Sequence, residues 1–352
     1  MSTNNLEQRI AILEEQNNAD RKHLERTQKQ MRTTWAVALG ATVCAFVLGW
    51  HKDAIAQGYG LTLAQAATKI AALETKTASM SVVSAADTSN TSGYQTVRFS
   101  GVNVQIVSGA GSTDAPVNGT GNLIIGYNEA GRGSYISGEG DRRGGSHNLI
   151  IGILNNYSSY GGLVSGNFNA TTGAYAAAFG HQNTASGLYA TVTGGELNKA
   201  VADASSISGG QSNTTTNNPY TSVSGGANNT ASGLYASVSG GNSNTASGQS
   251  SSVSGGATNT ASGEAASVSG GALNRAIADY SSISGGSQNT TSTNPYTSVS
   301  GGFRNTASGA DASVSGGSTN TASGQYSSVS GGFSRAATGT YNWAGGGYSQ
   351  DR

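Results

Sequence analysis

An apolar residue returns about every 15 residues over most of this chain, and this fixed spacing limits the folds that the chain can adopt. In "SVSGGNSNTASGQSSSVSGG", residues 237 to 256, Val238 and Val253 stand 15 residues apart. Fixed-period self-similarity is the signature of a repeat architecture, in which neighbouring units complete each other's core. The sequence also contains a second, longer repeat, because "LNKAVADASSISGG" from Leu197 recurs as "LNRAIADYSSISGG" from Leu273. The sequence therefore predicts a stack of short units that contains one five-unit block twice.

Each unit holds two short alternating segments, Ser-Val-Ser and Thr-Ala-Ser. Period two places Val238 and Ala246 on one face and the hydroxyl side chains on the other. Gly and Asn bound these segments, and both residues supply the positive φ angles that tight corners need. The same composition occurs in flexible linkers, but a linker has no reason to keep an apolar residue at a fixed spacing.

We therefore predict a mainly β fold, a parallel β-solenoid or β-roll whose coils vary in length from fourteen to sixteen residues. At about 4.8 Å between stacked strands, the rod would be about 70 Å long. The predicted core column consists of Ile124, Ile136, Ile150, Val164, Val192, Ile207, Val223, Val238, Val253, Val268, Ile283, Val299, Val314 and Val329.

Residues 33 to 50, "TTWAVALGATVCAFVLGW", carry no charge and have a Trp near each end. At 1.5 Å per residue this run spans about 27 Å, which is enough for the core of a bilayer. Basic residues concentrate before it, so the positive-inside rule predicts a cytoplasmic N-terminus and exported repeats. We expect a transmembrane helix or signal-anchor at 33 to 50. The alternative is a signal peptide cleaved near Ala56, within the small-x-small stretch Ala54-Ile55-Ala56, which would leave a secreted protein.

Heptad spacing of apolar residues flanks that segment. Residues 1 to 32 are expected to form a cytoplasmic heptad helix and residues 61 to 82 a coiled-coil stalk. The alternative is an amphipathic helix that packs on its own chain. The predicted seam of the oligomer consists of Leu63, Ala66, Ile70, Leu73, Thr77 and Met80.

A coiled coil that leads into Ser-Val-x-x-Gly and x-Ala-x-Gly coils resembles the YadA-like head of trimeric autotransporter adhesins. The matching residues are Ser237-Val238-Ser239-Gly240-Gly241 and Asn244-Thr245-Ala246-Ser247-Gly248, with their copies, over residues 120 to 345. The resemblance implies a left-handed parallel β-roll assembled as a homotrimer. Gly240 stands where the family has Ile, so the core should be thinner. The family's C-terminal β-barrel anchor has no counterpart in the short tail at 346 to 352, so we expect the resemblance to cover the head module alone.

Two segments at the ends of the repeats are candidate caps. Residues 94 to 118 alternate apolar and polar side chains, which predicts a strand pair that connects the stalk to the roll and caps its first coil. The other end is rich in aromatic residues, which predict either a second cap or an adhesive tip, since Trp and Tyr are favoured in binding hot spots. These aromatic residues are Phe333, Tyr341, Trp343 and Tyr348.

The sequence contains few candidates for catalytic or metal-binding residues. The four histidines have no metal-ligand spacing, and the single cysteine, Cys44, lies within the apolar run. "GRGSYISGEGDRRGG", residues 131 to 145, lacks the context of a phosphate loop and is expected to be a surface excursion. Eighteen basic residues balance eighteen acidic ones, which does not favour a nucleic-acid partner. We expect no enzyme activity, no metal and no cofactor.

The sequence thus favours an exported, membrane-tethered trimeric rod that acts as a structural or adhesive surface protein and binds an extracellular ligand by avidity. One alternative is an ice- or crystal-binding solenoid, although Lys199-Ala200-Val201 and Arg275-Ala276-Ile277 interrupt its hydroxyl ladder. Another is a phage or secreted fibre module. The candidate outward ladder consists of Thr184, Ser186, Thr230, Ser232, Thr245, Ser247, Thr260, Ser262, Thr306, Ser308, Thr321 and Ser323.

Overall fold

The computed structural model describes residues 62–83, 94–129, 142–216, 218–292 and 294–346, and the backbone of 348–350. The chain divides into two compact units, one ending at Val104 and the other beginning at Gln105. The predicted helix at 1 to 32 and the predicted membrane segment at 33 to 50 lie outside the described residues. Within the described ranges, no helix combines the length and the apolar character that crossing a membrane requires.

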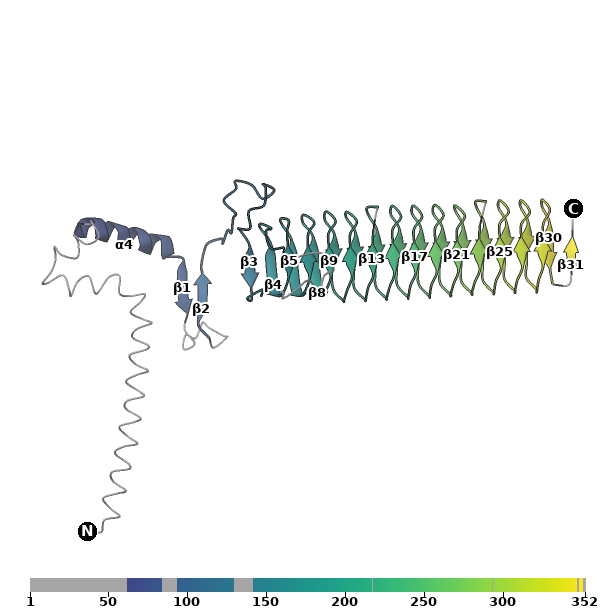
Figure 1. Cartoon of the computed structure of the whole chain (residues 1–352), viewed down its shortest axis with the longest axis horizontal. Helices are drawn as coiled ribbons and strands as arrows, with labels where there is room; N and C mark the ends of the chain where they lie inside the picture. Colours follow the sequence, from purple (N-terminus) through teal and green to yellow (C-terminus); the bar gives the residue numbers. More distant parts are fainter. Residues whose placement is uncertain are drawn as a thin grey trace, which may run out of the picture. The chain divides into compact units, whose positions relative to one another are not determined.

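The described part of the first unit, residues 62–83 and 94–104, holds one helix and one strand pair (Figure 1). Helix α4 (Leu63–Thr77) begins with a capping box, in which the Thr62 hydroxyl accepts from the Gln65 amide and the Gln65 side chain accepts from the Thr62 amide. None of its residues is buried, and Leu73 is 59% exposed. The apolar seam is therefore open in the single chain.

Two predictions for this unit are wrong. Met80 does not continue the helical seam, because the helix ends at Thr77 and Met80 opens strand β1 (Met80–Val83), which is rich in valine. Strand β1 pairs antiparallel with β2 (Thr96–Phe99), with Met80 opposite Phe99. The segment 94 to 118 therefore does not form a strand pair with itself, since its one strand takes a partner from before residue 84.

The second unit is a parallel β-solenoid, as predicted, with two strands in each complete coil (Figure 1). We call the sheet built from the first strand of each coil the Ser-Val sheet. Each of its strands pairs in parallel with the strand one coil away, except that the last two strands pair antiparallel. Its strands are β3 (Leu123–Ile125), β4 (Leu149–Ile153), β6 (Leu163–Asn167), β8 (Ala177–His181), β10 (Thr191–Val192), β12 (Ser206–Ile207), β14 (Ser222–Val223), β16 (Ser237–Val238), β18 (Ser252–Val253), β20 (Ser267–Val268), β22 (Ser282–Ile283), β24 (Ser298–Val299), β26 (Ser313–Val314), β28 (Ser328–Val329), β30 (Trp343–Gly345) and β31 (Tyr348–Gln350).

The second strand of each coil builds the Thr-Ala sheet, which is parallel throughout its 13 strands. These strands are β5 (Asn156–Tyr157), β7 (Ala170–Thr171), β9 (Thr184–Ala185), β11 (Lys199–Ala200), β13 (Thr214–Thr215), β15 (Thr230–Ala231), β17 (Thr245–Ala246), β19 (Thr260–Ala261), β21 (Arg275–Ala276), β23 (Thr290–Thr291), β25 (Thr306–Ala307), β27 (Thr321–Ala322) and β29 (Ala336–Ala337). A Gly-Gly corner leads from the Ser-Val strand to the Thr-Ala strand. A return corner leads from there to the next Ser-Val strand.

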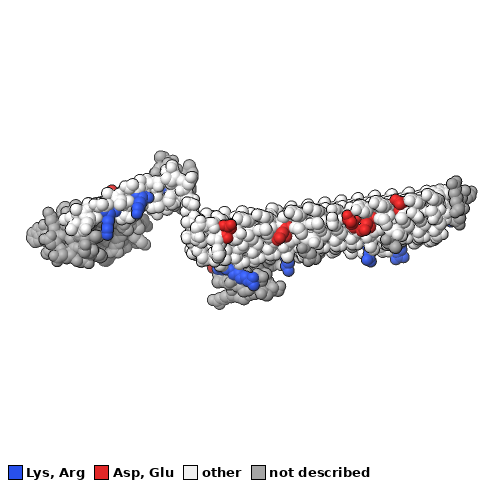
Figure 2. Space-filling model, turned by 90° about the horizontal axis from the view of Figure 1, so that it is seen from above, with Lys and Arg blue, Asp and Glu red and all other residues white. Residues whose placement is uncertain are grey.

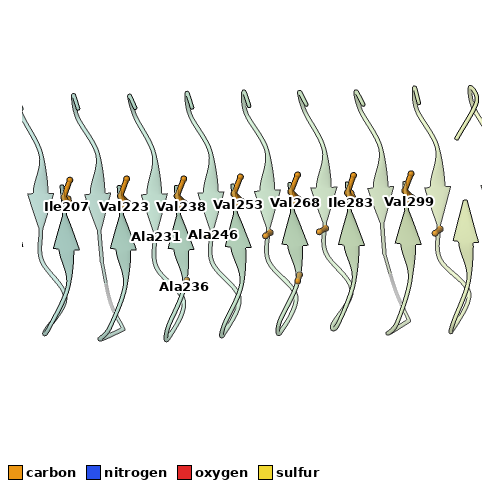
Figure 3. Packing of buried hydrophobic residues seen from close by; sticks show 14 of the residues in the cluster. Ile207, Val223, Ala231, Ala236, Val238, Ala246, Val253, Val268, Ile283 and Val299 are labelled. Atoms are coloured by element: carbon orange, nitrogen blue, oxygen red, sulfur yellow. The ribbon is translucent and has the colours of Figure 1, made fainter. Parts of the chain in front are cut away.

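The core is a pair of narrow columns, one of Val or Ile and one mainly of Ala, which face each other between the sheets (Figure 3). Parallel pairing in register aligns each Val with the next, as at Val238 and Val253. The predicted core residues that are at most 1% exposed are Ile150, Val164, Val192, Ile207, Val223, Val238, Val253, Val268, Ile283, Val299, Val314 and Val329.

The ends of the column differ from the prediction. Ile124 is 45% exposed, because β3 is the end strand of its sheet and has β4 as its single neighbour. Ile136 lies outside the described residues. At the other end the register pairs Val329 with Ala344, so Ala344 takes the core position and Trp343 faces outward.

A buried column of asparagines supports the Gly-Gly corner. Asn244 is fully buried, and its Nδ2 donates to the Gly240 and Gly256 carbonyls while its Oδ1 accepts from the Asn259 amide. The asparagine one coil further repeats this pattern, so the side chains form a continuous ladder. Its fully buried members are Asn155, Asn169, Asn183, Asn198, Asn213, Asn229, Asn244, Asn259, Asn274, Asn289, Asn305 and Asn320.

The expectation that Asn supplies the positive φ of the corner is wrong for this column. The residue before it does so, as Ser243 has a φ of 56°. Asn244 is instead held by its hydrogen bonds to both neighbouring coils. A second positive φ falls in the return corner, at Ser250 in the same coil, so non-glycine residues adopt the left-handed conformation at both corners.

Candidate binding surfaces of the solenoid

From Ser206 to Ser330 the outer surface of the Ser-Val sheet is a face of serines without interruption. Over this range serines precede and follow each core Val or Ile, and the parallel register stacks them into two columns at about 4.8 Å per coil. We call this surface the serine face. Its members are Ser206, Ser222, Ser237, Ser252, Ser267, Ser282, Ser298, Ser313 and Ser328 in one column, and Ser208, Ser224, Ser239, Ser254, Ser269, Ser284, Ser300, Ser315 and Ser330 in the other.

The predicted hydroxyl ladder lies on the outer surface of the Thr-Ala sheet. The register places Lys199 directly between Thr184 and Thr214, and it places Arg275 directly between Thr260 and Thr290. Both charged side chains are exposed, so they break the ladder where the sequence placed the interruptions. Thr214 and Thr290 belong to the column as well, although the sequence reading omitted them. Each is followed by a second threonine that takes the buried position of Ala.

Tyrosines line the return corner, which sequence spacing alone did not show. Tyr220 and Tyr235 stack with centroids 5.2 Å apart and planes 13° apart, and Tyr280 and Tyr296 do the same at 5.2 Å and 15°. Stacking follows from register, because these residues occupy one position in successive coils. We call this surface the tyrosine edge. Its exposed members are Tyr175, Tyr189, Tyr220, Tyr235, Tyr280, Tyr296, Tyr326 and Tyr341.

The pKa values of two edge tyrosines are raised. For Tyr280 the main cause is the hydrogen bond that its hydroxyl donates to Glu264 Oε1, 3.0 Å away, and the Glu264 charge adds to it. For Tyr175 the main cause of the raised pKa is desolvation, followed by the neighbouring Tyr160. Both shifts favour the neutral phenol over the phenolate.

Among the predicted tip aromatics, the three whose side chains are described lie on three different surfaces. Phe333, 71% exposed, lies at the Gly-Gly corner, in the column that contains Phe303 two coils earlier. Tyr341 is 67% exposed and stacks on Tyr326 at the return corner, as the last member of the tyrosine edge. The Trp343 indole donates to Ser330 Oγ at 2.7 Å on the serine face. Of Tyr348 only the backbone is described, in β31.

The connecting segment contacts the first coils of the solenoid. The Ser108 amide donates to His147 Nε2 at 2.9 Å, and the Asn118 amide donates to Ser146 Oγ at 3.0 Å. The Asn122 side chain donates to the Gly145 carbonyl at 2.8 Å. Residues 108 to 122 are therefore held against these coils without forming a regular sheet.

Most acidic side chains of the solenoid lie on a different side from the basic ones, although Glu196 lies at the Gly-Gly corner. Figure 2 looks onto the acidic side chains, while basic side chains project at the lower rim of the rod. The acids Asp203, Glu264, Asp279 and Asp311 belong to the return corner. The bases Lys199 and Arg275 stand in the outward threonine column, and Arg304 lies two residues before that column. Over the described ranges, no group of three or more His, Cys, Asp or Glu side chains is placed to hold a metal ion.

These features define the second unit as a parallel β-solenoid with a uniform core and variable corners. No protein-family model matches the sequence, and no curated protein matches it. The resemblance to YadA-like heads depends on the coil period and on the Ser-Val and Thr-Ala segments. The structure shows that these segments form a parallel β-solenoid repeat.

Proposed function

We propose that this chain is an exported, membrane-tethered trimeric rod that acts as a structural or adhesive surface protein. The observation that carries the proposal is the stacking in register of like side chains along one rod, which gives the serine face and the tyrosine edge. A surface built from many equal weak contacts gains strength through avidity, and three chains multiply that gain. The rod is the functional element, and we propose no catalytic activity for it.

Rigidity supports this role. Each coil is joined to the next by backbone bonds in both sheets and by the buried asparagine ladder, so an applied load is shared over the stack. The proposed trimer depends on the heptad seam of helix α4 (Leu63–Thr77). The proposed membrane tether depends on the apolar run at 33 to 50, with the N-terminus cytoplasmic. The exposed seam residues of helix α4 fit association with other chains. Cleavage near Ala56 would instead release the rod.

The test measures mass and adhesion on the full-length chain. Sedimentation in density-matched detergent should give three chains per particle. Vesicles that carry the chain should be retained under flow on glass, hydroxyapatite or a mixed extracellular-matrix coat, more than vesicles without protein. Replacing Tyr220 and Tyr296 by serine, or Ser237 and Ser267 by lysine, then identifies the adhesive surface. Retention equal to that of empty vesicles on every coat would overturn the adhesive role.

A second candidate function is lattice binding, and the unbroken serine face favours it. Lys199 and Arg275 interrupt the Thr-Ala ladder that the sequence suggested, whereas no charged residue interrupts the serine columns from Ser206 to Ser330. Thermal hysteresis of the full chain, abolished by lysine at Ser237 and Ser267 but retained with lysine at Thr245 and Thr260, would establish this function. A phage or secreted fibre module remains the third proposal, and cleavage of the N-terminal segment would favour it.

A further inference from the structure

The tyrosine edge is interrupted at one coil by an acid. Tyr296, Asp311 and Tyr326 occupy the same position of the return corner in three successive coils, and all three have a positive φ, of 59°, 56° and 59°. The Asp311 amide donates to the Pro295 carbonyl of the coil before, at 3.2 Å. The Tyr326 amide likewise donates to the Ala310 carbonyl at 2.8 Å, so the corner keeps the step of the stack. Asp311 therefore stands between two tyrosines along the rod.

Each of these two tyrosines is backed by another tyrosine on its far side. Tyr296 stacks on Tyr280 with centroids 5.2 Å and planes 15° apart, and Tyr326 stacks on Tyr341 at 4.9 Å and 10°. These separations are close to one coil step, so the stacking direction runs along the rod and the opposite ring faces look toward Asp311. We call the space between the rings of Tyr296 and Tyr326, with Asp311 at its base, the aspartate slot.

The coil step sets the width of this slot. Two steps of about 4.8 Å place the two rings about 10 Å apart. Aspartate is shorter than tyrosine, so the carboxylate lies at the base and the outer parts of the rings face each other above it. Tyr296 is 58% exposed and Tyr326 45%, so the slot opens to solvent.

The carboxylate at the base favours a cation. Within the described ranges, the exposed Asp311 side chain has no hydrogen bond or ion pair. Two other acids of the return corner differ from it, because the Asp203 carboxylate accepts from the Leu188 amide at 2.8 Å. The Asp279 carboxylate accepts from the Glu264 amide at 2.8 Å. The faces of tyrosine rings also attract cations, so both walls and the base of the slot select the same charge.

We propose that the aspartate slot binds a trimethylammonium group, as in choline. Carbon atoms make their best contacts at about 3.5–4.0 Å, so a flat guanidinium touches two rings only when these are about 7–8 Å apart. Two methyl groups on single C–N bonds of about 1.45 Å stand about 2.4 Å apart, so trimethylammonium spans walls about 9.4–10.4 Å apart. A primary ammonium is compact and strongly hydrated, and it gives up more on leaving water. The site lies within one chain, so it depends on neither the proposed trimer nor the proposed adhesive role.

Another coil of the same rod has equivalent walls without the acid. Ala204 stands between Tyr189 and Tyr220 at the same corner position, with a φ of 50°. Tyr189 stacks on Tyr175 at 5.4 Å, and Tyr220 stacks on Tyr235 at 5.2 Å. The Ala204 position therefore supplies an internal control for the carboxylate.

The test is a choline titration of the full-length chain in a maltoside detergent, which has no ammonium group, followed by saturation transfer from the protein to the choline methyl protons. Asp311→Asn and Tyr326→Leu should each weaken choline binding about fivefold, and an excess of potassium should not displace choline. The matched controls are Asp203→Asn and Tyr235→Leu. They remove an acid and a tyrosine of the same edge outside the slot, and choline binding should stay unchanged.

A gain of binding tests the reasoning independently. Ala204→Asp keeps a residue that tolerates a positive φ and adds the missing carboxylate. It should create a second site, seen as about twofold more transfer at saturating choline. Circular dichroism checks that each variant is folded. Unchanged binding in Asp311→Asn and Tyr326→Leu, or no second site in Ala204→Asp, would overturn the proposal.

A bilayer assay distinguishes a lipid headgroup from a free compound as the source of the cation. Phosphatidylglycerol vesicles that carry the chain should be retained under flow on a phosphatidylcholine bilayer more than on a phosphatidylethanolamine bilayer if the headgroup enters the slot. Equal retention with choline binding intact would assign the slot to free trimethylammonium compounds. Choline binding without retention on any coat would overturn the adhesive role and leave the slot in place.

Discussion

Replacing Asn259 by alanine is the sharpest test of what holds the coils together. The side chain is fully buried, and its Nδ2 donates to the Gly255 carbonyl at 2.9 Å and the Gly271 carbonyl at 3.0 Å. Its Oδ1 accepts from the Asn274 amide at 3.0 Å. Alanine removes all three bonds and fills none of the space that they occupied.

The cost follows from the groups left without a partner. The Gly271 carbonyl keeps the bond from the Ala257 amide, so two backbone groups are orphaned, the Gly255 carbonyl and the Asn274 amide. Each orphaned buried group costs about 1–3 kcal/mol, which predicts a loss of about 2–6 kcal/mol in the free energy of unfolding. Asn259→Asp should cost more at neutral pH, since a buried carboxylate can accept from the amide but would face two carbonyls.

The assay is guanidinium unfolding of the full-length chain, followed by circular dichroism, with Ser254→Ala as the control. Ser254 lies on the serine face of the same coil and is exposed. Unfolding of a repeat stack need not be two-state, so the first transition to shift identifies the local loss. If Asn259→Ala unfolds within about 0.5 kcal/mol of Ser254→Ala, the asparagine ladder does not stabilise the stack.

Three further predictions concern single positions. Gly248→Ala should prevent stacking at its coil, because the new Cβ would lie 1.9 Å from a carbonyl oxygen of the next coil. The control is Gly255→Ala, whose new Cβ meets nothing within 4 Å, and thermal unfolding of the two variants should show a loss of stability for Gly248→Ala alone. Ser251→Ala should stabilise the chain by about 1 kcal/mol in guanidinium unfolding, because the Ser251 hydroxyl is buried without a hydrogen-bond partner, and a loss of stability would contradict this. Glu264→Gln should lower the raised pKa of Tyr280 in an ultraviolet pH titration. Because the folded pKa is the higher one, the hydrogen bond stabilises the fold below the ordinary tyrosine pKa of about 10 and is lost as the pH rises through the folded value.

The period of the apolar residues was sufficient to predict the solenoid, because one Val in each coil must stack on the next to be buried. The asparagine ladder could not be predicted in the same way. Asn is frequent at turns for local reasons, and only the stacked neighbour shows that the Asn244 side chain reaches carbonyls 4 and 12 residues away.

The surfaces were only partly predictable for the same reason. The alternation of side chains along the Ser-Val strands predicted that the serines face outward. The tyrosine edge could not be predicted from a fixed spacing, because the coils that carry the tyrosines differ in length. Tyr280 and Tyr296 stack although the coil that separates them is one residue longer than the coils on either side. The prediction for Met80 was wrong because heptad spacing does not mark where a helix ends. There the valines of β1 find a partner strand after residue 95.

The duplicated block gives an internal comparison of which positions the fold constrains. Between residues 197 to 256 and 273 to 332, no buried residue differs, from the Asn, Val and Ala columns to the buried hydroxyls such as Thr215 and Thr291. Every difference among the described residues falls on a position that is exposed or half-buried, mostly at the corners. Both copies belong to one rod, so the same packing constraints apply to both cores. The substitutions therefore show which surface positions can change without loss of the fold, or change because they serve a function. The paired change to Arg304 and Asp311 alters the charge at both corners of one coil. We therefore expect the two halves of the rod to differ in their contacts with partners at the corners of that coil.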